Sequence, residues 1–175
     1  MHPRILELLQ QELRDGFPGL AGGEVAASIP ISDRIINELI ASLIPEGGKV
    51  RDVTIATEPG NLLSAKARLA GPSLLPSIPV TFVIDQQPEF PLRPVLGLKL
   101  SQPSRFVAMV FSTLPSLVTL PPPLTIAGDR VLINIRQLAA EKGLESWLAY
   151  VADLKVTTRA SAVVLNVRLK VPTAL

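Results

Sequence analysis

Apolar and polar residues alternate in two segments of the chain that match each other. The first occupies residues 50–69 with a turn at 58–61, and the second occupies residues 151–169 with a turn around 159–161. Thr57 in the first segment corresponds to Thr158 in the second, with one residue of slack in the turn. Alternation with a period of two residues is typical of a strand with one buried face. Each segment is therefore predicted to form an antiparallel hairpin.

A strand and an apolar helix are expected before each hairpin. Residues 24–31 alternate as a strand, and Ser32 or Asp33 begins a helix that runs to Leu43. In the second half, residues 124–135 predict a hairpin or a bent strand, after which Asn134 caps a helix. The chain is thus predicted to contain two β-α-β-β units, at 23–70 and 123–171, that form a pseudo-repeat around a shared apolar interior.

The remaining segments complete a single domain over residues 1–175. A helix is predicted at 3–15, and residues 76–120 are predicted to hold a central hairpin followed by a helix. The order of elements indicates an α+β fold, a mostly antiparallel sheet packed on amphipathic helices. The positions expected to face the interior are Ile36, Leu39, Ile40, Leu43, Val80, Phe82, Ile84, Leu96, Leu98, Leu100, Phe106, Met109 and Val110.

Composition narrows the classes of function. Apolar residues make up 47% of the chain and aromatic residues only 4%, so the interior is aliphatic. The net charge is +2, and the basic residues are not clustered with aromatics, which argues against nucleic-acid binding. The chain has no cysteine. We see neither a signal peptide nor a membrane-spanning run, and we expect a cytoplasmic protein.

Residues that carry chemistry are few. His2 is the single histidine, which excludes a Ser-His-acid triad and a two-histidine metal site. No glycine-rich phosphate loop is present, and the spacing of the acidic residues indicates no catalytic pair. Asp52 and its counterpart Asp153 are interpreted as residues that make a local hydrogen bond or fix hairpin register. We therefore expect no catalytic residue, no metal, no cofactor and no enzymatic activity.

Trp147 and Tyr150 are the only tryptophan and tyrosine, and their spacing places them on one helical face. Two interpretations stay open. The pair either closes the edge of the core or forms an amphipathic rim at the mouth of a pocket or at a membrane surface.

Three segments carry a resemblance to a known family: residues 31–41 with the strand at 50–55, residues 124–135, and the closing hairpin. Together they resemble bacterial members of the tubular lipid-binding superfamily, which includes the synaptotagmin-like mitochondrial lipid-binding domains. The resemblance covers residues 23–171 and rests on element order and alternation. It implies a curved antiparallel sheet around an aliphatic groove or tunnel that binds or transfers a lipid or another long apolar molecule.

The residues themselves leave alternatives open. The apolar positions above can line a groove, or they can pack as an ordinary closed core, which burial alone favours. The second hypothesis is a protein–protein interaction module with a filled core, such as a homodimer. The third is an enzyme that uses carboxylates alone, which would require two acids in one pocket.

Overall fold

The computed structural model describes residues 21–43, 50–69, 77–101, 107 and 120–172. The helix predicted at 3–15 lies outside the described residues, as does the helix after residue 102 apart from Val107. In chain order the elements are β1 (Glu24–Ser32), α2 (Asp33–Leu43), β2 (Val50–Glu58), β3 (Leu62–Leu69), β4 (Ile78–Gln86), β5 (Val95–Leu100), β6 (Leu124–Ala127), β7 (Arg130–Asn134), α4 (Ile135–Glu141), the 3₁₀ helix η2 (Glu145–Tyr150), β8 (Val151–Arg159) and β9 (Ala162–Lys170).

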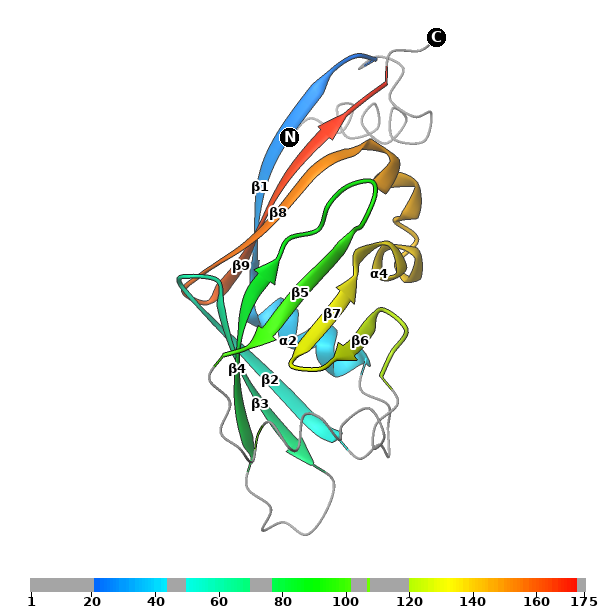
Figure 1. Cartoon of the computed structure of the whole chain (residues 1–175). Coiled ribbons are helices and arrows are strands. Elements are labelled where there is room, and N and C mark those ends of the chain that lie inside the picture. The colour runs from blue at the N-terminus through cyan, green and yellow to red at the C-terminus, as the bar shows by residue number, and fades with distance from the viewer. Residues whose placement is uncertain (1–20, 44–49, 70–76, 102–106, 108–119, 173–175) are drawn as a thin grey trace, which may run out of the picture.

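The strands form two antiparallel sheets, which confirms the predicted α+β class. Sheet A has three strands in the order β1-β9-β8, and sheet B has six in the order β2-β3-β4-β5-β7-β6. Figure 1 shows an elongated molecule in which sheet A forms one end and the hairpin of β2 and β3 reaches the other. Sheet B curls into a half-barrel.

The two predicted units exchange partners. β1 belongs to the first unit, yet it pairs along its whole length with β9 of the second, from Glu24 opposite Lys170 to Ser32 opposite Ala162. The hairpin that follows α2 lies in sheet B instead. Sheet A is therefore built from residues near both ends of the described chain.

The two matched hairpins share a detail of register. In β2–β3 the pairing shifts between Val50 and Asp52, and in β8–β9 it shifts at the corresponding place, between Val151 and Asp153. A bulge of this kind adds one residue to one strand and increases its twist. Asp52 and Asp153 follow the shift directly, so the two hairpins match in register at the same place.

The main core lies where the two sheets meet. Its buried members are Leu63, Ile84, Leu96, Leu98, Leu154 and Val156, which come from β3, β4, β5 and β8. The alternation of each strand places these side chains on one face of its sheet. Leu154 and Val156 of sheet A thus share one cluster with residues of sheet B.

The second helical segment follows the predicted signals. The side chain of Asn134 caps α4 by accepting a hydrogen bond from the Gln137 N–H at 3.2 Å. α4 ends before Gly143, which has a φ of 68°, and η2 then leads into β8. These elements bring the chain from sheet B back to sheet A.

Candidate functional site

Sheet A has one apolar face, and its register shows how that face is assembled. Three rows cross the sheet from β1 through β9 to β8, and each row joins three apolar side chains. The rows are Val25–Leu169–Val151, Ala27–Val167–Leu154 and Ile29–Leu165–Val156. A fourth row ends in a polar residue: Ile31–Val163–Thr158.

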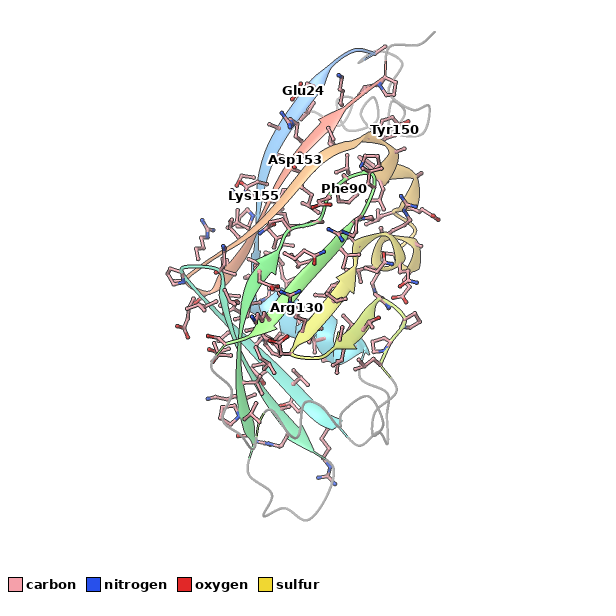
Figure 2. The ribbon with its side chains drawn as sticks, in the orientation of Figure 1. Glu24, Phe90, Arg130, Tyr150, Asp153 and Lys155 are labelled. Carbon is pink, nitrogen blue, oxygen red and sulfur yellow. The ribbon has the colours of Figure 1, made fainter. Side chains whose placement is uncertain are left out.

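The opposite face of sheet A is polar. Arg168 of β9 lies between Ala26 and Asp153, and its Nε is 3.6 Å from Oε1 of Glu24. Lys155 is opposite Asn166 one pair further along. Figure 2 labels Glu24 on β1 and Asp153 and Lys155 on β8. The contrast between the faces indicates that water meets one face and apolar groups meet the other.

The cover over the apolar face is uneven. At β8, Leu154 and Val156 are 9% and 3% exposed, whereas at β1 Val25 and Ile29 are each 47% exposed. The β9 residues between them are half-buried. The apolar face is therefore closed along β8 and open along β1.

The closed side is held by the connection between β4 and β5. Phe90 of this connection packs against the core cluster, and Figure 2 shows it close to β8. The side chain of Gln87 binds the backbone of Val156 twice: its Nε2 donates to the carbonyl at 2.8 Å, and its Oε1 accepts from the N–H at 2.7 Å. An amide side chain thus takes the place of a neighbouring strand on the outer edge of β8.

A second contact secures the same edge two residues further on. The N–H of Thr158 donates to Oδ1 of Asn61 at 3.3 Å, and the Thr158 hydroxyl donates to the carbonyl of Glu58. Asn61 lies in the β2–β3 turn with a φ of 64°. The turn of one hairpin is in this way bound to the last residues of β8.

The outer edge of β2 is closed in the same manner by α2. The side chain of Asn37 binds the backbone of Ile55, accepting from its N–H at 2.6 Å and donating to its carbonyl at 2.9 Å. Asp33 accepts from the N–H and the hydroxyl of Thr57, at 3.0 and 2.6 Å. The matched residues Thr57 and Thr158 therefore have the same role. Each forms hydrogen bonds that fix the outer edge of its hairpin.

The α2 helix leaves part of its apolar surface open. Ile35 and Leu39 are 48% and 37% exposed, while Ile36 and Ile40 are half-buried. The helix follows β1 directly and turns Asp33 and Asn37 toward β2. A further stretch of partly covered apolar side chains therefore begins where β1 ends.

The predicted interior positions fall into three groups. Four are buried: Ile84, Leu96, Leu98 and Leu100. Five are half-buried or exposed: Val80 and Phe82 on β4, and Ile36, Leu39 and Ile40 on α2, of which Leu39 is the most exposed. The structure does not describe the side chains of Leu43, Phe106, Met109 and Val110.

The open positions on β1 are not among the lining residues predicted from the sequence. Val25, Ala27 and Ile29 were expected on one side of a strand, and their alternation was the available signal. Their exposure depends on the order of strands in sheet A, because sheet B covers the apolar face at β8 and β1 lies at the opposite edge of the sheet. Local pattern carries no information about that order.

The two aromatic residues at 147 and 150 lie on η2, just before β8. Both are half-buried. Spacing of three residues in a 3₁₀ helix places them on the same side. Leu144, at the start of η2, is 50% exposed.

Polar chemistry is sparse in the part of the chain that the structure describes. No group of three or more His, Asp or Glu side chains that could hold a metal ion is found among those residues. The best-buried ion pair joins Arg130 to Asp85 at 2.8 Å, with the Asp85 side chain 18% exposed. Among the described helices, none has the length and apolar character needed to cross a membrane.

Comparison of the chain with protein-family models, with curated proteins and with solved structures gives no significant match.

Proposed function

We propose that this protein binds a lipid or another long apolar molecule without chemical change, along the apolar face of sheet A. One observation carries the proposal: an unbroken apolar face is covered along β8 and open along β1. Contact of such a face with water is unfavourable, because burial of apolar surface stabilises a folded chain by roughly 25 cal/mol for each Å². A bound apolar ligand would recover that free energy.

The dimensions of the face favour an elongated ligand. The four rows follow one another along β1 from Val25 to Ile31. At a rise of about 3.3 Å per residue, the face is about 20 Å long in this direction. The side chains are aliphatic, so they offer dispersion contacts and no fixed polar partner. This surface suits an extended hydrocarbon chain better than a compact polar molecule.

The predicted resemblance to the tubular lipid-binding superfamily accords with this proposal. The curled antiparallel sheet B is compatible with that architecture. The matched bulges and the matched threonine contacts support the predicted pseudo-repeat of the two hairpins. The buried cluster of Ile84, Leu96 and Leu98, which covers the face at β8, would border the binding region on that side.

The first test is extraction of protein purified from cells. Organic extracts are analysed by mass spectrometry, and the protein is titrated with a fluorescent fatty acid. We expect co-purified lipid and saturable binding. A clean extract together with no fatty-acid binding by folded protein would rule the proposal out.

A matched pair of variants locates the site. Ile29→Asp places a charge on the open apolar face, whereas Ser28→Asp places it on the polar face of the same strand. We expect Ile29→Asp to weaken fatty-acid binding by at least about tenfold, the equivalent of about 1.4 kcal/mol, and Ser28→Asp to leave it unchanged. Equal effects of the two variants would place the site elsewhere.

The alternative is an interaction module with a filled core and no ligand. The close packing of Leu96 and Leu98 against Leu154 favours it. In that case the extract is clean, the probe does not bind, and the open face of β1 is covered by another protein. The extraction and the titration therefore separate the two functions.

A further inference from the structure

The outer edges of the two sheets differ in whether side chains form hydrogen bonds to their backbone. β2 is closed by Asn37 and Asp33, and β8 is closed by Gln87 and Asn61. The fourth edge strand, β6, has only four residues. β1 has nine residues, and no hydrogen bond to its outer edge is found in the described part of the chain. Open edges of this length normally pair or are protected.

The direction of the backbone groups in β1 follows from its pairing with β9. The N–H of Val171 donates to the carbonyl of Gly23 at 3.0 Å, so Gly23 faces β9. Alternate residues of an antiparallel strand face the same neighbour. Glu24, Ala26 and Ser28 therefore direct their N–H and C=O groups outward. Pro30 falls in the same series, as expected for a residue with no N–H to donate.

We propose that this edge pairs, antiparallel, with the same edge of a second copy of the chain, about a two-fold axis at Ala27. The inference does not depend on the proposed ligand, because it concerns the edge of β1 and not its face. The occupant is a second copy because the edge is complementary to itself.

The side chains favour this register over one with the axis at Ala26. An axis at Ala27 places Val25 opposite Ile29 of the second copy, with the small Ala27 pair between the two apolar contacts. On the other face it places Glu24 opposite Pro30 of the second copy, so no like charges meet. An axis at Ala26 would instead set Ile29 opposite Gly23 and lose an apolar contact on each side. Opposed apolar pairs of this kind stabilise a sheet.

Pairing would join two three-stranded sheets into one continuous sheet. An axis perpendicular to the sheet keeps both apolar faces on the same side, so the open face would double in width. A single strand pair lies at the small end of specific interfaces, and we expect a reversible dimer with a dissociation constant on the order of micromolar.

Sedimentation velocity on the full chain, over about a hundredfold range of concentration, tests the proposal. The expected result is a monomer that converts to a dimer. Ala26→Pro removes one outward N–H without removing a bond to β9, and it should weaken the dimer by at least about tenfold. Ala26→Val keeps that N–H and should dimerise like the parent chain.

A charge exchange tests the register. Val25→Lys with Ile29→Lys places like charges opposite each other across the axis and should abolish the dimer. Val25→Lys with Ile29→Glu loses the same apolar residues but sets opposite charges against each other, and it should dimerise more strongly than the first pair. Circular dichroism confirms that both fold.

A monomer at every concentration would overturn the proposal, as would a dimer that responds equally to both charge pairs. Hydrogen exchange gives an independent reading, because the amides of Glu24, Ala26 and Ser28 should become protected as concentration rises. A monomer that binds fatty acid would refute the dimer alone. A dimer that binds no fatty acid would refute the ligand alone.

Discussion

Replacement of Gln87 by alanine tests one of the contacts that join the two sheets. The side chain links the end of β4 to β8, 69 residues further along the chain, through two hydrogen bonds to the backbone of Val156. Val156 is 3% exposed, so water has little access to the backbone groups that Gln87→Ala would leave without partners. Both the donor and the acceptor of one residue would be affected at once.

The expected cost follows from these contacts. Each hydrogen bond contributes about 0.5–1.5 kcal/mol net, and a buried group left unsatisfied costs about 1–3 kcal/mol. We expect Gln87→Ala to lower the free energy of unfolding by about 3 kcal/mol. For a domain of this size the melting temperature would fall by about 2–4 °C for each kcal/mol, thus by about 6–12 °C.

Urea unfolding followed by circular dichroism measures this change. The matched control is Gln86→Ala, which removes the same atoms from the neighbouring residue. Gln86 makes a single longer bond, from its Nε2 to the carbonyl of Val95 at 3.3 Å, and its loss should cost about 1 kcal/mol. If Gln87→Ala costs no more than Gln86→Ala, the side chain does not hold the edge of β8.

Two further predictions concern sheet B. Asn37→Ala should lower the free energy of unfolding by about 2–3 kcal/mol, because it leaves both backbone groups of Ile55 without a partner. The control Glu38→Ala, on the same helix, breaks only an exposed ion pair with Arg34 and should cost about 0.5 kcal/mol or less. Equal midpoints in urea for these two variants would contradict the first value. Gly97→Ala would place a Cβ 2.8 Å from the Cβ of Gln86, and we expect it to lower the free energy of unfolding by about 1–3 kcal/mol. Thermal unfolding measures this change, and an unchanged melting temperature would mean that the strand moves to accept the new methyl group.

Local structure was largely predictable from the sequence. The strand expected at 24–31 is found at Glu24–Ser32, and the helix expected from Ser32 or Asp33 to Leu43 is found at Asp33–Leu43. These elements are encoded by alternation, by helical spacing and by caps, all of which act between near neighbours. The apolar alternation of the two hairpins also indicated which side chains share a face.

The arrangement of the sheets could not be predicted in the same way. Pairing of β1 with β9 joins residues that are far apart in sequence, and alternation looks the same whichever strand lies alongside. The candidate site depends on that arrangement, since Val25 and Ile29 lie on the edge of sheet A opposite β8, the strand that sheet B covers.

The structural roles of these polar residues could not be predicted from the sequence either. Asn37 and Gln87 appear in the sequence as ordinary polar positions, but each binds both backbone groups of an outer strand. The matching positions of Thr57 and Thr158 are visible in the sequence. Their hydrogen-bond partners Asp33 and Glu58 are not, because the fold alone brings these residues together.

The pairing of β1 with β9 has a consequence for synthesis. Ribosomes make β1 long before β9, so sheet A cannot begin to form until residues 162–170 have emerged. Until then a strand with exposed Val25 and Ile29 has no intramolecular neighbour, a state in which nascent chains associate wrongly or recruit chaperones. Chains arrested before residue 162 should therefore aggregate, and the closing hairpin should decide how much of the protein reaches its folded state.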